Sequence, residues 1–152
     1  MNIRKATAMD VGNILELLKQ LKISGYAEMG IEDPKVKKAD NAEEFFKQIV
    51  TEPENVILIA EEENKPIGLA VCYLVPKIFD GEYRLLIEEM VVSENYRGKG
   101  VGSALLNEIE NEAQNLNINV IKLTTGTKLK ANEFYKKHGY THFENAYRKK
   151  LN

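Results

Sequence analysis

The chain has little cysteine and histidine, and this scarcity excludes several kinds of site. Cys72 is the single cysteine among 152 residues, so no intramolecular disulfide can form. It stands within the apolar run LAVCYLV, which predicts a buried structural thiol rather than a nucleophile. Only His138 and His142 supply imidazole groups. With so few sulfur and imidazole ligands, we expect no metal site, zinc in particular.

Long apolar runs and an excess of charge of one sign are also absent. No stretch approaches the roughly 18 apolar residues that a transmembrane helix needs. The opening MNIRKATAMDVGN lacks the apolar core of a signal peptide. The 21 basic and 23 acidic residues leave a net charge of −2, which gives no reason to expect a nucleic-acid-binding surface. We therefore expect a cytoplasmic protein with neither a membrane nor a nucleic acid as partner.

What is present is the composition of an ordinary globular domain, with 43% apolar and 29% charged residues. Neither repeats nor linkers interrupt it, so we expect one domain over residues 1–152. Apolar periodicity predicts helices over residues 9–22, 42–50, 100–115 and 128–138. Strands are expected over residues 2–6, 55–63, 67–75, 83–92, 119–125 and 140–151, the last closing the sheet. Residues 24–41 are expected to be a loop or a short irregular helix. The fold class is therefore α/β (α+β) on a mixed sheet.

The stretch NYRGKGVGSALL, residues 95–106, places three glycines directly before a predicted helix. The N-terminal turn of a helix carries unpaired N–H groups and attracts anions. Glycines let the backbone approach a phosphate, and Arg97 and Lys99 add positive charge. The Walker pattern is absent, and Ser103 stands where the dinucleotide fingerprint needs its last glycine. The loop therefore predicts a phosphate-bearing ligand, with a ligand-free glycine turn as the alternative.

The run Arg97-Gly98-Lys99-Gly100-Val101-Gly102 resembles the acetyl-coenzyme A signature of the GNAT superfamily of N-acetyltransferases, Arg/Gln-x-x-Gly-x-Gly/Ala. The stretches IEEMVVSENY and ANEFYKKHGY are also similar to stretches of that family, and the order of elements over residues 1–151 matches. The resemblance implies a mostly antiparallel central sheet flanked by about four helices. It also implies that the fourth and fifth strands splay apart at an acetyl-coenzyme A site.

The same resemblance implies which residues bind the cosubstrate. Backbone N–H groups would cradle its pyrophosphate, from Gly98, Lys99, Gly100, Val101, Gly102 and Ser103. The phosphates would lie near Arg97 and Lys99. The amides of the pantetheine arm would bond to the open backbone edge of Met90, Val91 and Val92. Many family members carry an asparagine where this chain has Lys128, so Asn132, one helical turn on, is a substitute candidate.

Acetyl transfer to an amine requires a base, a donor to the developing oxyanion and an acid for the leaving thiolate. The resemblance implies that Tyr135 is the acid, although its helical spacing also fits a core aromatic. Glu88 and Glu89 are the candidate bases, and strand alternation predicts that they point to opposite faces. Glu88 matches the proposed base of the spermidine/spermine acetyltransferases that this stretch resembles, and Glu89 matches an acidic position common in the superfamily. The alternative is that both carboxylates are structural.

The acceptor is expected to be the primary amine of a small molecule, polyamine-like or aminoalkylphosphonate-like. The regions that would line its side carry Tyr26, Glu28, Glu32, Asp33, Asp80, Glu82 and Tyr83, which would suit a cationic amine. Lys35, Lys37 and Lys38 lie beside them, so solvated surface charge is the other interpretation. Two further functions stay open, a protein N-acetyltransferase and a non-catalytic acetyl-coenzyme A-binding module. A homodimer is also among the expectations, because the C-terminal strands could pair across an edge.

Overall fold

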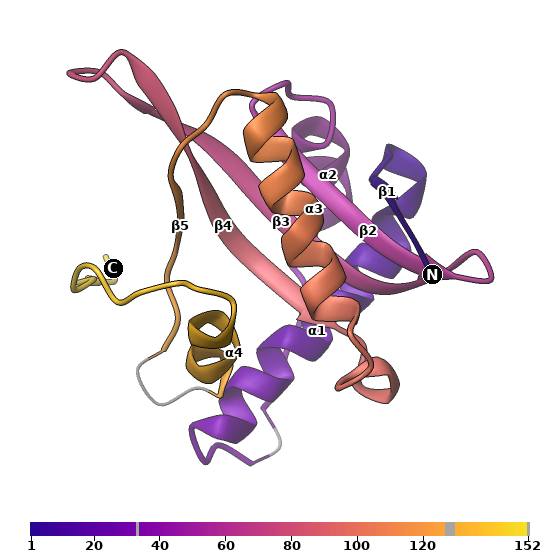
Figure 1. Ribbon diagram of the computed structural model, residues 1–152. Coiled ribbons are helices and arrows are strands. Elements are labelled where there is room, and N and C mark those ends of the chain that lie inside the picture. The colour runs from indigo at the N-terminus through magenta and orange to yellow at the C-terminus, as the bar shows by residue number, and fades with distance from the viewer. Residues whose placement is uncertain (33, 127–129, 152) are drawn as a thin grey trace.

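The computed structural model describes residues 1–32, 34–126 and 130–151, and a five-stranded sheet runs through its middle (Figure 1). The strands neighbour one another in chain order: β1 (Asn2–Lys5), β2 (Asn55–Glu62), β3 (Lys65–Lys77), β4 (Glu82–Val92) and β5 (Ile121–Leu123). The first three neighbouring pairs are antiparallel, whereas β4 and β5 run parallel. The prediction of a mixed, mostly antiparallel sheet is confirmed.

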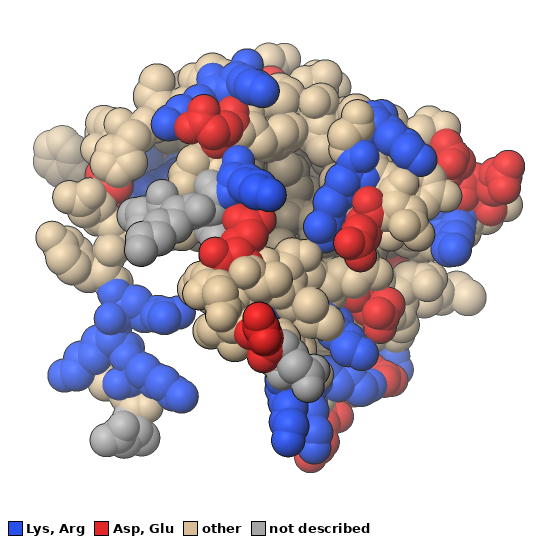
Figure 2. Space-filling model, turned by 90° about the horizontal axis from the view of Figure 1, so that it is seen from below, with Lys and Arg blue, Asp and Glu red and all other residues tan. Residues whose placement is uncertain are grey.

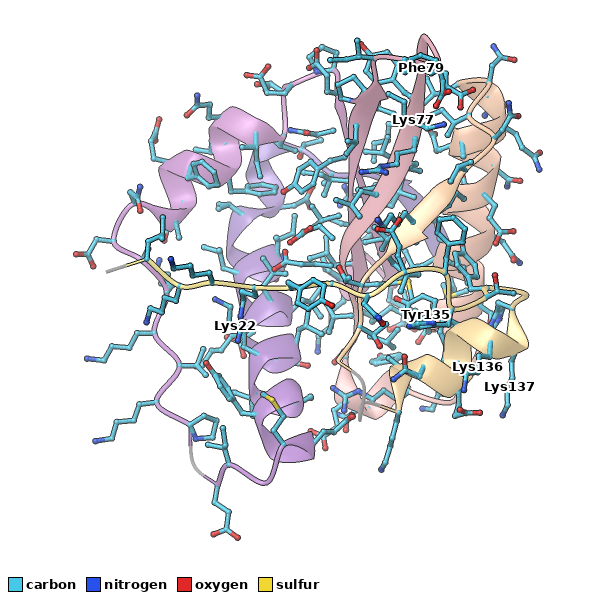
Figure 3. All side chains as sticks on the ribbon, turned by 90° about the vertical axis from the view of Figure 1, so that its left-hand side faces the viewer. Lys22, Lys77, Phe79, Tyr135, Lys136 and Lys137 are labelled. Carbon is cyan, nitrogen blue, oxygen red and sulfur yellow. The ribbon has the colours of Figure 1, made fainter. Side chains whose placement is uncertain are left out.

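Helices cover both faces of this sheet. They are α1 (Val11–Glu28), α2 (Ala42–Ile49), α3 (Val101–Asn115) and α4 (Ala131–Lys137), with short 3-10 turns over Ala8–Asp10 and Glu94–Tyr96. Figures 1 and 3 show α1 and α2 on one face, α3 on the other, and α4 near the lower end of the sheet. Each face therefore has its own hydrophobic core, and these cores share the strands between them.

The two cores explain why β2 and β3 are continuous apolar runs rather than alternating ones, since strands covered on both faces bury every side chain. On the α3 face, the buried cluster includes Leu58, Cys72, Leu85, Leu105, Leu106 and Ile109. On the α1 face, it includes Ile14, Leu17, Phe46, Ile57, Ile59 and Leu69. Cys72 is fully buried, and burial raises the pKa of its thiol to about 12. The prediction of a buried structural thiol is confirmed.

Helix α1 is longer than the sequence predicted. Its predicted end at residue 22 is wrong, because the helix continues through Gly25 to Glu28. A Cβ on Gly25 would meet nothing within 4 Å, so this glycine sits in an ordinary helical turn. Two residues beyond Glu28, Gly30 adopts a φ of +77° and donates its N–H to the carbonyl oxygen of Ala27, which terminates the helix. Gly30, and not Gly25, is therefore the glycine that terminates α1.

The predicted strand over residues 140–151 does not form. Residues 141–151 carry no strand assignment and are exposed along their whole length. Phe143, Tyr147 and Leu151 are 87%, 95% and 78% exposed, so nothing in the same chain covers the apolar side chains of this segment. Figure 2 shows its Lys- and Arg-rich end projecting from the body of the molecule at the lower left. The sequence alternates only loosely here, and the neighbouring strand β5 has three residues instead of the predicted 119–125.

Candidate functional site

Strands β4 and β5 separate halfway along β4. Their ladder runs from Leu85–Ile121 to Ile87–Leu123. Beyond it, within the described residues, no strand pairs with residues 88–92 on the β5 side. An open edge of this kind offers backbone N–H and C=O groups to an extended, amide-bearing ligand. The predicted splay of the fourth and fifth strands is therefore present.

A β-bulge lies at the point of separation. In the β3–β4 ladder, Val71 pairs with Glu89 and Cys72 pairs with Ile87, so Glu88 has no partner between them. The extra residue changes which face the later side chains take: Ile87 belongs to the α3-face core and Val91 to the α1-face core. The bulge breaks the simple alternation that the sequence predicted for the two glutamates.

Glu89 reaches the α1 side of the sheet, where it is half-buried. It lines a hollow of about 530 Å³ between α1 and residues 36–43, together with Lys19 and Lys22. Burial, and then the charge of Glu88, raise the pKa of Glu89, while Lys22 lowers it. Glu88 is exposed. A half-buried carboxylate with a raised pKa beside a hollow is a typical candidate base.

Tyr73 and Lys22 are neighbours of these carboxylates that the sequence analysis missed. The pKa of Tyr73 is raised by burial and then by the charges of Glu89 and Glu88. Lys22 stands at the last position of the predicted helix, where the sequence shows only one lysine among many. No local pattern marks either residue, because β3 and α1 approach β4 only in the folded chain.

The glycine loop has the geometry of an anion cradle. Gly98 and Gly100 adopt φ values of +74° and +84°, and a Cβ on either would meet nothing within 4 Å. Gly100 begins α3 with no side-chain cap, so no side chain covers the N–H groups of the first turn. These features fit the pyrophosphate of coenzyme A.

Arg97 and Lys99 are held beside this loop. The Arg97 guanidinium donates to the carbonyl oxygen of Val92 at 3.1 Å and to Ser24 Oγ at 2.9 Å. It thereby joins the glycine loop to the end of β4 and to α1. Lys99 Nζ lies 5.3 Å from the centroid of the Tyr96 ring. Both cations stay at the position where phosphates are expected, although Arg97 is also a structural link.

Helix α4 packs on the start of α3 through two contacts. A Cβ on Gly102 would lie 3.4 Å from the Phe134 ring, so this ring packs directly against the first turn of α3. His138 Nε2 lies 2.9 Å from Ser103 Oγ, and its Nδ1 lies 2.8 Å from the carbonyl oxygen of Phe134. Because a carbonyl can only accept, Nδ1 carries a proton, and in the neutral imidazole Nε2 then accepts from the serine hydroxyl. His138 thus orients Ser103, a contact that the sequence analysis did not identify.

Tyr135 lies on α4 and packs against the α3-face core (Figure 3). Its ring makes edge contacts with Phe134 and Tyr140, at centroid distances of 5.2 and 5.7 Å. Burial raises the pKa of its phenol to about 12, so the hydroxyl stays protonated at neutral pH. No hydrogen bond joins this hydroxyl to another residue of the described chain.

Of the two candidates for the pantetheine contact on this helix, Lys128 lies outside the described residues. The Asn132 side chain donates to the carbonyl oxygen of Gly126 at 2.8 Å and accepts from Thr125 Oγ1 at 2.6 Å. It therefore fastens the segment that follows β5 to α4. A contact of Asn132 with the cosubstrate stays a prediction.

The acidic residues expected around the acceptor do not converge. Asp80 and Glu82 both pair with Lys77 at the tip of the β3–β4 hairpin. Figure 3 shows Lys77 and Phe79 at the opposite end of the sheet from Lys22 and Tyr135. The Glu28 carboxylate accepts the N–H of Lys130 at 3.0 Å, and Asp33 lies outside the described residues.

Across the described ranges, no helix is both long and apolar enough to cross a membrane. In the same ranges, no three His, Cys, Asp or Glu side chains gather as metal ligands would.

Comparisons with known proteins agree with this geometry. Residues 22–140 match the sequence profile of the Acetyltransferase (GNAT) family. An uncharacterized N-acetyltransferase of Methanocaldococcus jannaschii is 30% identical over 141 residues, which are 91% of this chain but only 59% of that protein. An uncharacterized N-acetyltransferase of Archaeoglobus fulgidus is 25% identical over 137 residues, 89% of each chain.

A solved structure shares the fold. It is that of a predicted acetyltransferase from Clostridium acetobutylicum with acetyl-coenzyme A, at a TM-score of 0.80 and 25% identity, covering 99% of this chain and 96% of that one. The family profile, the relatives and the open edge beside the glycine cradle all point the same way. The chain belongs to the GNAT family of acetyltransferases.

Proposed function

We propose that this domain acetylates the primary amine of a small molecule. The observation that carries the proposal is the open edge of β4, which has the glycine cradle at its end and a bulge with two adjacent carboxylates at its start. The glycine cradle fits the pyrophosphate of coenzyme A, and the open edge of β4 fits its pantetheine arm. The bulge fits the point at which the thioester would meet an amine.

The binding roles follow from this arrangement. N–H groups of residues 98–103 hold the pyrophosphate, and Arg97 and Lys99 add charge beside it. The main chain of Met90, Val91 and Val92 bonds to the pantetheine amides, with the Val92 carbonyl shared with Arg97. These contacts fix the position of the thioester relative to Glu88 and Glu89, which lowers the entropic cost of the reaction.

Acetyl-coenzyme A supplies an activated thioester: the amine nitrogen forms a bond to its carbonyl carbon, and the carbon–sulfur bond breaks. Glu89 or Glu88 takes the proton that the ammonium must lose, directly or through a water. The raised pKa of Glu89 and its place in a hollow support it as the base. Tyr135 gives a proton to the departing sulfur, and solvent restores both groups.

The experiment that tests this function is thiol release with a panel of amines. Polyamines, aminoalkylphosphonates, aminoglycosides, amino acids and short peptides are each incubated with acetyl-coenzyme A. Turnover on small amines and none on peptides supports the proposal. Turnover confined to peptides favours a protein N-acetyltransferase. Calorimetric binding of coenzyme A with no turnover on any amine favours a non-catalytic module.

We also propose that two copies of the chain associate through the C-terminal segment. Phe143, Tyr147 and Leu151 stand four residues apart, so pairing of this segment as a strand would place them on one face as an apolar stripe. This stripe is exposed, and β5 is an edge strand of the sheet. Glu144 pairs with Lys122 of β5 at 2.7 Å, which holds the start of the segment beside that edge. A second copy of the chain, docked here, would cover the apolar stripe and the edge of β5 together.

A further inference from the structure

Two adjoining hollows on the α1 face carry different charges. The larger is the hollow of about 530 Å³ that Glu89 lines. The smaller, about 340 Å³, is lined by Lys22, Tyr26, Pro34, Lys35, Val36 and Lys37. Lys22, Val36 and Lys37 border both hollows, so a single small molecule can occupy both.

The smaller hollow suits an anion. Among the described residues that line it, three are lysines and none is acidic. No ion pair joins Lys22, Lys35 or Lys37 to a carboxylate of the described chain. Tyr26, 38% exposed, can add a hydroxyl donor. Like charges that border one hollow repel each other, and a bound anion relieves that repulsion.

The larger hollow suits an ammonium group at its β4 end. Of its other carboxylates, Glu43 already pairs with Lys38, and Glu16 lies on the same helix as Lys19 and Lys22. Glu89 is the carboxylate that comes from the sheet, next to the open edge of β4. Lysines therefore border the combined hollow along its length, and Glu89 places a carboxylate at the β4 end, next to the reacting centre.

We propose that the acceptor is an amine that also carries an anionic group, held by Lys22, Lys35 and Lys37 while its nitrogen faces Glu89. This inference rests on the proposed function and narrows its substrate class. An amine with a second cationic group is disfavoured, because that group would meet three lysines. The anionic group also orients the acceptor, so the lysines act as specificity residues rather than as catalytic ones.

The test compares amines that differ only at the far end. 4-Aminobutyrate and 3-aminopropylphosphonate carry a carboxylate and a phosphonate, butylamine carries neither, and 1,4-diaminobutane carries a second amine. We expect kcat/KM for both anionic amines to exceed that for butylamine by roughly 10-fold or more, with the diamine lowest. A preference between the two anionic amines identifies the kind of anion.

Charge reversal then locates the preference. Lys35→Glu and Lys37→Glu should each raise KM for the preferred anionic amine by roughly 10-fold and leave KM for acetyl-coenzyme A unchanged. Lys65→Glu, on the exposed start of β3, is the matched control and should change neither constant. Circular dichroism confirms that each variant is folded.

Binding without turnover separates this inference from the proposed function. 3-Aminopropylphosphonate is titrated into protein saturated with coenzyme A, so that the glycine cradle is occupied. Binding that Lys35→Glu abolishes supports the anion site even if no amine is acetylated, a result that would overturn only the proposed function. Acetylation that favours butylamine or the diamine, or that is insensitive to both charge reversals, overturns the anion site and leaves the proposed function standing.

Discussion

Tyr135 can be a core aromatic and an acid at the same time. Its ring packs against the α3-face core, which gives the aromatic role that its helical spacing predicted. Its hydroxyl has a pKa raised to about 12 by burial, so it carries a proton that it can donate at neutral pH. The two interpretations of the sequence therefore concern different atoms of one side chain. Removing the hydroxyl alone separates them.

Tyr135→Phe should lower kcat by roughly 10²-fold, about 2.7 kcal/mol of barrier, because the leaving sulfur loses its proton donor. KM for acetyl-coenzyme A should stay within a few-fold, and stability should change little because the ring is kept. Steady-state thiol release measures both constants. Tyr140→Phe, which removes the hydroxyl of the neighbouring ring, is the control and should keep near-normal kcat. Unchanged kcat in Tyr135→Phe would leave this residue with its packing role alone.

Glu89→Gln should lower kcat by roughly 10- to 10³-fold at neutral pH, since the amide keeps the shape but cannot accept a proton. Burial raises the pKa of Glu89, so kcat/KM of the wild type should fall as pH drops through that raised pKa and the carboxylate becomes protonated. The variant should lose this acid limb. The loss of rate should shrink at high pH, where free amine is abundant.

Glu88→Gln distinguishes the two candidates. If Glu88 acts only by raising the pKa of Glu89, its replacement should shift the acid limb to lower pH and change kcat little. A loss of kcat as large as that of Glu89→Gln would instead assign the base to Glu88. Glu94→Gln, on the exposed turn after β4, is the control carboxylate and should leave the pH profile unchanged.

At the scale of elements, the sequence predicted those features that local chemistry decides. Three closely spaced glycines before an apolar helical pattern predicted the loop and α3. The β-bulge has no such signal, because Glu88 and Glu89 read as two residues of a regular strand. Its position depends on how β3 and β4 align, which is a property of the sheet.

Gly100→Glu should abolish coenzyme A binding in calorimetric titration. The carboxylate would stand at the mouth of the N-terminal turn of α3, where it repels the pyrophosphate. The positive φ at this position adds strain, so the comparison needs a variant with the same strain elsewhere. Gly81→Glu, at a φ of +67° in the β3–β4 hairpin, supplies it and should keep wild-type affinity. Equal affinities in the two variants would remove the loop from the binding site.

The start of α1 is held by a carboxylate that should make stability depend on pH. Asp10 is 7% exposed, and its carboxylate accepts hydrogen bonds from Arg4 and Thr7. Chiefly because of the Arg4 guanidinium, the pKa of Asp10 is lowered from 3.8 to about 2. Because the pKa of Asp10 is lower in the folded than in the unfolded state, its ionised carboxylate stabilises the fold at pH values above the unfolded-state pKa. This stabilisation is lost as pH falls from about 4 toward about 2. The contribution at neutral pH is about 2 kcal/mol.

Asp10→Asn should therefore lower the free energy of unfolding by about 2 kcal/mol at pH 7, because the amide no longer carries the charge that pairs with Arg4, although Arg4 keeps its ion pair with Glu61. Urea denaturation followed by circular dichroism measures this difference, which should narrow below about pH 4. The exposed Asp40→Asn is the matched control and should stay within about 0.5 kcal/mol of the wild type. A difference that persists undiminished at low pH would refute the linkage.

At the scale of the whole molecule, the candidate site could be predicted only in part. The glycine cradle, Tyr135 and the two glutamates lie in the three short stretches of sequence that resemble the family, so the sequence alone predicted them. Lys22 comes from α1 and Lys35 and Lys37 from the segment after it, and only the fold brings them to the two hollows beside Glu89. In the sequence, the charges of these lysines are indistinguishable from ordinary solvated surface charge.

The exposed C-terminal segment gives the prediction that belongs to the assembled molecule. We expect the wild type to sediment as a dimer at micromolar concentration, because Phe143, Tyr147 and Leu151, each at least 78% exposed, would otherwise face water. Phe143→Ser combined with Tyr147→Ser should weaken the dimer by roughly 10²-fold or more in its dissociation constant, since burying two aromatic side chains contributes a few kcal/mol. Tyr83→Ser, which removes a half-exposed aromatic from β4, should leave the dimer intact. Because both copies keep their own β4 edge and glycine cradle, the double variant should still bind coenzyme A. A wild type that stays monomeric at about 100 μM, well above the dissociation constant of a stable dimer, would show that the segment has another role.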